Sequence, residues 1–237
     1  MKIFAVIPCY NVGKYIINLV NQTLKHVDKV IIIDDCCPLK TSEFVEKEFM
    51  GNDKIYIIKN KKNLGVGGAV IEGYKYSIFH NPDFLVKLDG DGQMDPEYIN
   101  LFLKKAINES ADYVKGNRFF FSKDILNMSL IRIIGNIGVS FLGKISTGYW
   151  DIFDFTNGYT LIKTQTLKKI NLSQLKNNYF FETDLLYHLN LINAKVRDIY
   201  IPAKYSKVKS NLKIRKIFFY FFFYNMLNFI KRIYKKF

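Results

Sequence analysis

The chain has 237 residues, of which 49% are apolar, so it can form a hydrophobic core and is not a disordered protein. Its formal net charge is +14, and ten Lys or Arg with no Asp or Glu lie between Ile199 and Phe237. Such a basic segment is typical of binding to nucleic acid or to an anionic membrane, and it can also serve solubility. The three cysteines, Cys9, Cys36 and Cys37, fit neither a disulfide framework nor a zinc site, so we expect reduced thiols.

Short β-branched runs alternate with amphipathic segments in the N-terminal half. Strands are predicted at Ile3–Ile7, Val30–Ile33, Ile55–Ile58, Phe84–Leu88 and Tyr113–Lys115. Helices are predicted near Gly13–Lys25, Ser42–Phe49, Gly67–Phe79 and Pro96–Asn108. Apolar strands separated by helices indicate a mostly parallel sheet with helices on both faces, so the expected fold class is α/β.

The pattern changes after Arg118. The segment Ile125–Ile145 is apolar but contains Arg132 and two glycines, which is consistent with a lid, a groove wall facing a membrane, or a loosely packed surface helix. A strand at Tyr159–Ile162, a helix at Phe180–Leu191 and a strand at Val196–Ile201 follow. We expect one globular domain over residues 1–210 and a separate C-terminal segment over residues 211–237.

The C-terminal segment is aromatic as well as basic. Its uncharged part, Ile217–Ile230, would be roughly 21 Å long as a helix, whereas a bilayer core is about 30 Å thick. Lys and Arg flank it on both sides, which favours a helix lying in the head-group layer. The alternative is an aromatic helix packed on the domain or in a dimer interface. Because no signal peptide precedes Met1, we expect a peripheral protein on the cytoplasmic face of the membrane.

The run Leu88–Gln93 follows the fourth predicted strand and contains two aspartates and two glycines. In extended geometry, Asp89, Asp91 and Gln93 would point the same way and offer hard oxygen ligands to a divalent cation. Such a cation could hold the diphosphate of a nucleotide. The alternative is an ordinary Asp-Gly turn.

Polar residues also follow the other predicted strands, and ligands of parallel sheets bind at these carboxyl ends. Asn11 follows the first strand, Asp34 and Asp35 the second, and Asn63 the third. Asp34 and Asp35 could accept hydrogen bonds from a ribose or a base, or they could cap the loop. The glycines after Asn63 would let the next helix approach the nucleotide or its neighbours closely, and their place after the third strand does not favour a dinucleotide-binding oxidoreductase.

Seven motifs occur in order over most of the chain: Ile7–Asn11, Ile33–Asp35, Asn63–Ala69, Asp89–Pro96, Lys115–Arg118, Asp154–Tyr159 and Phe181–Leu186. With these motifs the chain resembles the inverting family-two glycosyltransferases of GT-A fold, within them the dolichol-phosphate mannose synthase-like branch. The run Tyr149–Phe153 resembles bacterial surface-polysaccharide glycosyltransferases of the same family. The run Tyr205–Ile214 departs from the mannose synthase pattern, which leaves the sugar and the acceptor open.

The resemblance implies a Rossmann-like GT-A sheet and a nucleotide-diphosphate sugar, with UDP or GDP, as donor. The implied nucleotide-binding residues are Pro8, Tyr10, Asn11, Asp34, Asp35, Asn63, Gly67 and Asp89. Asp91 and Gln93, with Asp89 as a further candidate, would coordinate Mg²⁺ or Mn²⁺, which prefer oxygen ligands. Arg118 and Arg132 match positions that bind phosphate groups in this branch, a role suited to guanidinium groups.

Two acceptors are consistent with the resemblance. A polyprenyl phosphate is already anionic and needs no strong base, so Asp91 and its metal would act mainly by alignment and charge neutralisation. A hydroxyl of a lipid-linked glycan in surface-polysaccharide synthesis would need a base, for which Glu182 and Asp184 are the candidates. The non-enzyme alternative is a basic protein that binds a membrane or nucleic acid. It would leave the acidic run without a role, so we expect no nucleic-acid partner. The sequence does not indicate the oligomeric state.

Overall fold

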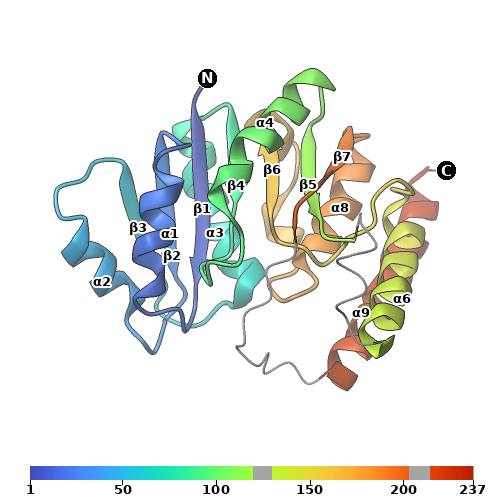
Figure 1. Ribbon diagram of the computed structural model, residues 1–237. Helices are drawn as coiled ribbons and strands as arrows, with labels where there is room; N and C mark the ends of the chain where they lie inside the picture. The colour runs from blue at the N-terminus through green and yellow to red at the C-terminus, as the bar shows by residue number, and fades with distance from the viewer. Residues whose placement is uncertain (120–129, 203–213, 237) are drawn as a thin grey trace.

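The computed structural model describes residues 1–119, 130–202 and 214–236 (Figure 1). The strands are β1 Ile3–Cys9, β2 Lys29–Asp34, β3 Ile55–Lys59, β4 Phe84–Lys87, β5 Tyr113–Asn117, β6 Thr160–Lys163 and β7 Val196–Tyr200. They form one seven-stranded sheet in the order β3-β2-β1-β4-β6-β5-β7. Only β6 runs antiparallel to its neighbours among these strands. The mostly parallel α/β sheet expected from the sequence is therefore confirmed.

The helices cover both faces of this sheet. They are α1 Tyr15–Thr23, α2 Thr41–Glu48, α3 Gly65–His80, η1 Pro96–Tyr98, α4 Ile99–Asn108, α6 Leu130–Thr147, α7 Thr164–Leu167, η2 Leu172–Gln174, α8 Phe181–Leu191 and α9 Ile214–Lys236. Alternate residues of β1 enter two separate cores, as the pleat of a strand requires. Ala5 and Ile7 lie in the core covered by α1, α2 and α4, whereas Phe4 and Val6 lie in the core covered by α3 and α8.

The carboxyl ends of β1, β2, β3 and β4 lie at one edge of the sheet because these strands are parallel. Cys9 at the end of β1 is in register with Asp34 at the end of β2, and Val6 is in register with Lys87 at the end of β4. The loops that leave these strands carry the polar motifs of the sequence. The fold therefore brings residues from widely separated parts of the chain to a single edge.

The C-terminal helix α9 lies beside α6 at the β7 side of the molecule (Figure 1). Phe221, Asn225 and Asn228 of α9 are buried, and Arg232 donates to the carbonyl oxygens of Ile145 and Ser146 at the end of α6. One face of α9 is thus packed on the domain, as the alternative to a head-group helix predicts. The expected boundary at residue 210 lies outside the described residues, as do residues 125–129 of the predicted apolar segment and most of the run Tyr205–Ile214.

Among the residues that the structure describes, no helix has the length and apolar character needed to cross a membrane.

Candidate active site

The acidic run does not continue β4 as an extended strand. The strand ends at Lys87, and the chain turns through Gly90 and Gly92, the latter with a φ of 74°. A Cβ on Gly90 would lie 3.0 Å from both Cys9 Sγ and the Pro8 carbonyl oxygen, so a glycine there lets the turn lie against the end of β1. The expected extended geometry of Asp89, Asp91 and Gln93 is therefore wrong, and a turn sets their directions instead.

A cavity of about 490 Å³ lies between this acidic turn and the neighbouring strand ends. Its lining residues come from the end of β1, from the loops after β1, β2, β3 and β4, from the start of α3 and from the segment before α8: Pro8, Cys9, Tyr10, Val12, Asp35, Asn63, Gly65, Val66, Ala69, Asp89, Gly90, Asp91, Asn178 and Tyr179. Six of the candidate site residues named from the sequence thus meet at one cavity. Of the described residues, the lining does not include Asn11, Asp34 or Gly67.

Asp34, the last residue of β2, and Asp35, which follows it, have different surroundings. Asp34 is buried, and its two carboxylate oxygens accept hydrogen bonds from the backbone N–H groups of Cys37 and Ser42 at 2.7 and 2.9 Å. This is the loop-capping arrangement that the sequence left open. Asp35 accepts from the N–H groups of Leu64 and Gly65, each at 2.9 Å, and it also lines the cavity. Asp35 therefore joins the end of β2 to the beginning of α3 on the cavity wall.

The glycines of α3 allow a close approach to the segment that precedes α8. A Cβ on Gly67 would lie 2.4 Å from the Lys176 carbonyl oxygen, and the N–H of Gly68 donates to the Asn177 carbonyl oxygen at 3.1 Å. The missing side chains at Gly67 and Gly68 therefore allow α3 to pack against the backbone of Lys176 and Asn177. This contact places Asn178 and Tyr179 on the cavity wall. The sequence reasoning missed both residues, because their loop carries no strand or motif signal.

Two buried lysines lie behind the acidic turn; the sequence analysis did not single out Lys87, and it gave Lys115 no role beyond its place in the motif Lys115–Arg118. Lys87 of β4 and Lys115 of β5 are each in register with Thr160 of β6, so all three lie in one row across the sheet. The Nζ of Lys87 lies 2.7 Å from Oδ1 of Asp89 and 2.9 Å from Oε1 of Glu182. Burial acts to lower the pKa of Lys87, but the carboxylates of Asp89 and Glu182 hold that pKa above its ordinary value.

The two candidate bases, Glu182 and Asp184, are engaged by other parts of the protein. Oε2 of Glu182 lies 3.7 Å from Nζ of Lys115, whose pKa is lowered by burial. Asp184 accepts at Oδ2 from the N–H of Lys176 and at Oδ1 from Nδ2 of Asn228, both at 3.0 Å. Neither acid is among the described residues that line the cavity. The geometry gives both acids structural partners.

Arg118, one of the two expected phosphate-binding arginines, forms a two-pronged ion pair. Its Nε and Nη2 donate to the two carboxylate oxygens of Asp154 at 2.7 and 2.9 Å. Its side chain is partly exposed, whereas Asp154 is buried. Asp154 thereby fixes the direction of the guanidinium. Arg132 lies in the first turn of α6, and its side chain is outside the part of the chain that the structure describes.

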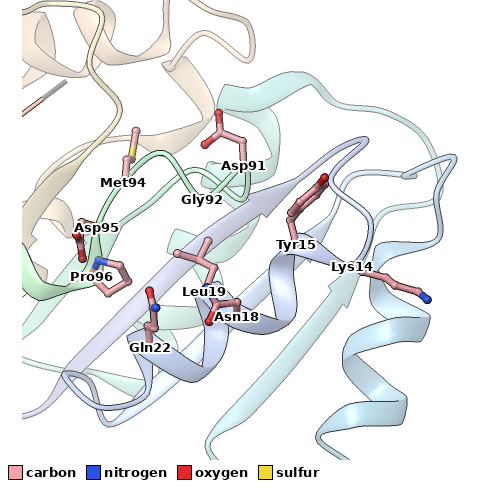
Figure 2. A pocket seen from close by; sticks show the side chains of 10 residues that line it. All are labelled: Lys14, Tyr15, Asn18, Leu19, Gln22, Asp91, Gly92, Met94, Asp95 and Pro96. Atoms are coloured by element: carbon pink, nitrogen blue, oxygen red, sulfur yellow. The ribbon is translucent and has the colours of Figure 1, made fainter. Parts of the chain in front are cut away.

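A second cavity, of about 370 Å³, lies on the α1 side of the acidic turn. Figure 2 shows Tyr15, Asn18 and Gln22 of α1 beside the loop that carries Asp91 and Asp95. Asp91 lines both cavities, so the turn forms a wall between them. Gln93, the third metal-ligand candidate, lines a different small cavity together with Tyr159 and Ile201. The structure thus brings Asp89 and Asp91 to the main cavity but not Gln93.

The chemistry of the main cavity suits a divalent cation that shares its ligands with a phosphate. Burial and the charge of Asp89 raise the pKa of Asp91, and a bound cation would relieve both effects. Within residues 1–119, 130–202 and 214–236, no three His, Cys, Asp or Glu gather into a complete metal site. Mg²⁺ is ordinarily held by one or two carboxylates plus substrate phosphates. Asp89 and Asp91 match that ligand set.

With this geometry established, comparison with known proteins identifies the family. Residues 4–170 match the family model described as "Glycosyl transferase family 2". The chain is 31% identical, over 92% of its length and 93% of the relative's, to the UDP-N-acetylglucosamine–dolichyl-phosphate N-acetylglucosaminyltransferase of Methanococcus voltae. It is 24% identical to the undecaprenyl-phosphate mannosyltransferase of Micrococcus luteus, over 84% of this chain and 82% of that one. The protein is a nucleotide-sugar glycosyltransferase, and it belongs to glycosyltransferase family 2.

A solved structure confirms the fold assignment. The glucosyl-3-phosphoglycerate synthase of Mycobacterium tuberculosis, in complex with Mn²⁺, UDP and phosphoglyceric acid, superposes with a TM-score of 0.69 and 12% identity. The match covers 98% of this chain and 78% of the synthase. At this identity the likeness shows the fold alone, which is the GT-A arrangement expected from the motifs.

Proposed function

We propose that the protein transfers one sugar from a nucleoside-diphosphate sugar to a polyprenyl phosphate at a membrane surface, with inversion at the anomeric carbon and with Mg²⁺ or Mn²⁺. The observation that carries the proposal is the meeting of Asp89 and Asp91 with three other strand-end loops at one cavity. Family membership supports the donor class. The two relatives described above, named for dolichyl phosphate and undecaprenyl phosphate, support the acceptor class.

The residues of the cavity can each be given a role with the donor. The exposed rings of Tyr10 and Tyr179 offer flat apolar faces for a base, and Asp35 and Asn63 offer polar groups for a ribose. Asp91, with Asp89, would hold the metal, which supplies positive charge to the departing diphosphate. GDP and UDP remain equal candidates, because these groups do not distinguish the two bases.

The surroundings of the acids support a phosphate as acceptor. A phosphate oxygen is anionic near neutral pH and can attack without a general base. The candidate bases are instead engaged, Glu182 by Lys87 and Asp184 by Asn228. Attack by the acceptor on the side opposite the leaving diphosphate is a single displacement, which inverts the anomeric carbon. Transfer to a hydroxyl would require one of these acids to leave its partner.

The outer face of α9 supports a membrane as the place of reaction. The face packed on the domain carries Asn225 and Asn228, whereas the exposed residues are mostly apolar: Phe219, Tyr220, Phe222, Phe223, Met226, Ile230, Ile233 and Tyr234. A helix in water shows the opposite distribution. Exposed Lys231 and Lys235 lie near its end, where they could meet anionic head groups. The helix would therefore use one face to bind the domain and the other to bind lipid.

The function can be tested by product analysis with the full-length protein. The protein is incubated with Mn²⁺, a panel of UDP-sugars and GDP-sugars, and short polyprenyl phosphates, and products are identified by mass spectrometry. We expect a single glycosyl polyprenyl phosphate, formed only with the divalent ion and with inverted configuration by NMR. In a parallel incubation with a lipid-linked glycan as acceptor, transfer to the glycan and none to polyprenyl phosphate would favour the hydroxyl alternative. Binding of membranes without transfer from any donor would contradict the enzyme proposal.

A further inference from the structure

We propose that Lys87 is a positioning residue that holds the carboxylate of Asp89 in place for the nucleotide and its metal. The inference rests on the proposed function, because it assigns a role within the same site. Lys87 does not line the main cavity, whereas Asp89 does. Lys87 would therefore act through Asp89 rather than by touching the donor.

The geometry directs one oxygen of Asp89 toward Lys87. Oδ1 of Asp89 lies 2.7 Å from Nζ of Lys87, and the Asp89 side chain is 35% exposed while that of Lys87 is 2% exposed. The ion pair is therefore buried on the lysine side and open on the cavity side. A carboxylate fixed through one oxygen has a defined direction for the other, which can then meet a ribose hydroxyl or a metal ion.

Glu182 holds the lysine from behind. Its Oε1 lies 2.9 Å from Nζ of Lys87, and it lies in the first turn of α8, where the helix dipole favours a carboxylate. A buried lysine is costly unless it is paired, and here two carboxylates share it. With Lys115 the group contains two cations and two anions, so its charges balance. Glu182 is assigned the role of counter-ion to Lys87 in place of general base.

Gly158, in the loop before β6, leaves room for this pair. A Cβ on Gly158 would lie 2.2 Å from Nζ of Lys87 and 2.9 Å from Oδ2 of Asp89. The backbone of the preceding residue, Asn157, accepts a hydrogen bond from Nζ of Lys115. The same loop therefore covers both lysines, and it is in contact with Asp89 as well as with Lys87. A methyl group there would displace the pair without removing any charge.

Lys115 provides a matched control. It is a buried lysine on the same face of the sheet, it is in the same register row, and it approaches Glu182 at 3.7 Å. The described contacts of its Nζ are with Asn157 and Glu182 and do not include Asp89. Loss of either lysine removes a buried charge, but only the loss of Lys87 frees Asp89.

The experiment compares Lys87→Met, Lys115→Met and Gly158→Ala with the wild type by isothermal titration of UDP and GDP in the presence of Mn²⁺. The nucleotide that the wild type binds more tightly is used throughout, and folding is checked by circular dichroism. We expect Lys87→Met and Gly158→Ala to weaken binding about 10- to 100-fold, as is usual when a partner of a ligating group is lost. Lys115→Met should weaken binding clearly less than Lys87→Met does, because the Nζ of Lys115 contacts Asn157 and Glu182 and not Asp89.

Different results would refute different claims. Wild-type protein that binds neither nucleotide with Mn²⁺ would contradict the proposed function itself. Two results would overturn only the role of Lys87, provided that the wild type binds nucleotide. One is normal or tighter binding by Lys87→Met, and the other is an equal loss of binding in Lys115→Met. If the variants do not fold, a crystal structure of the wild type with nucleotide and Mn²⁺ tests whether Lys87 holds Asp89. Asp89 must keep Oδ1 on Lys87 in that complex, and its departure from Lys87 would refute the inference.

Discussion

Asn228 of α9 donates a hydrogen bond from Nδ2 to Oδ1 of Asp184 at 3.0 Å, and both residues are buried. Asp184 is in the first turn of α8, and its other oxygen accepts from the N–H of Lys176. The loop that begins at Lys176 continues to Asn178 and Tyr179 on the wall of the main cavity. The C-terminal helix is therefore joined to the wall of the main cavity through the carboxylate of Asp184, and Phe180, next to Tyr179, also packs on the rings of Phe221 and Tyr224 of α9.

Substitution of Asn228 tests this connection. Asn228→Ala should lower the free energy of unfolding by about 1–3 kcal/mol, because Asp184 would keep a buried acceptor without its donor. Urea denaturation followed by circular dichroism measures the change. Met226→Ala, on the exposed face of the same helix, should alter stability by less than about 0.5 kcal/mol. Equal stabilities of the two variants would show that the bond does not hold α9.

Substitution of Asp91 tests the metal assignment. Asp91→Asn should reduce turnover by at least about 100-fold, because the charge of the departing diphosphate would lose its compensation. The melting temperature should not fall, since the amide oxygen of an asparagine can still accept from the N–H of Gln93, as Oδ1 of Asp91 does at 3.0 Å. Asp53→Asn, in the exposed loop before β3, is the control and should keep full activity. Mn²⁺-dependent activity that survives in Asp91→Asn would remove Asp91 from the metal site.

The outer face of α9 can be tested by paired substitution. Phe219→Ser combined with Phe223→Ser should release the protein from anionic vesicles, because each buried Phe contributes about 1.5–3 kcal/mol to partitioning. Vesicle sedimentation measures the bound fraction. Point substitutions are preferable to deletion of residues 215–237, which would also uncover the packed surfaces of α6 and α8.

Phe79→Ser is the control for this pair, since Phe79 on α3 is 86% exposed but lies on a different element. It should bind vesicles as the wild type does. Unchanged sedimentation of the paired α9 variant would contradict the lipid-binding face.

Substitution of Gly67 tests the approach of α3 to the segment before α8. In Gly67→Ala the new methyl would lie 2.4 Å from the Lys176 carbonyl oxygen, a backbone atom that cannot turn aside. We expect lower stability and weaker nucleotide binding, because Asn178 and Tyr179 would be displaced. Gly138→Ala in α6, where a Cβ would meet nothing within 4 Å, should be neutral or stabilising by up to about 1 kcal/mol. Normal nucleotide affinity in Gly67→Ala would show that this contact does not shape the cavity.

His188 predicts a pH dependence of stability. Burial lowers the pKa of His188 below 6.5, Asp184 opposes this, and Lys235 and Lys231 add to it. The unfolded chain therefore takes up the proton more readily than the folded one. The stability that neutral His188 contributes is present above about pH 6.5 and is lost as the pH falls through the folded pKa. Denaturant unfolding at about pH 7 and about pH 5 should show a smaller loss in His188→Gln than in the wild type; an equal loss would exclude His188 as its source.

The structure changes two expectations about the polar residues at strand ends, and each change has a local cause that the sequence did not show. Asp34 and Asp35 are adjacent at the end of β2 and are alike in sequence, but Asp34 caps its own loop while Asp35 reaches the cavity wall. The extended geometry assumed for Asp89 to Gln93 failed because β4 is one residue shorter than predicted and the glycines turn the chain. In each case the direction of a side chain depended on a backbone conformation that residue types alone do not specify.

The sequence by itself determined the strands, most of the helices and the positions of the polar residues at strand ends, because hydrophobic periodicity and turn residues act over short distances along the chain. Only the tertiary structure decided which group each acid contacts. Lys87 and Glu182 are 95 residues apart, and Asp184 and Asn228 are 44 residues apart. Their pairing depends on the order and register of strands and on the packing of α8 and α9, which no local pattern records.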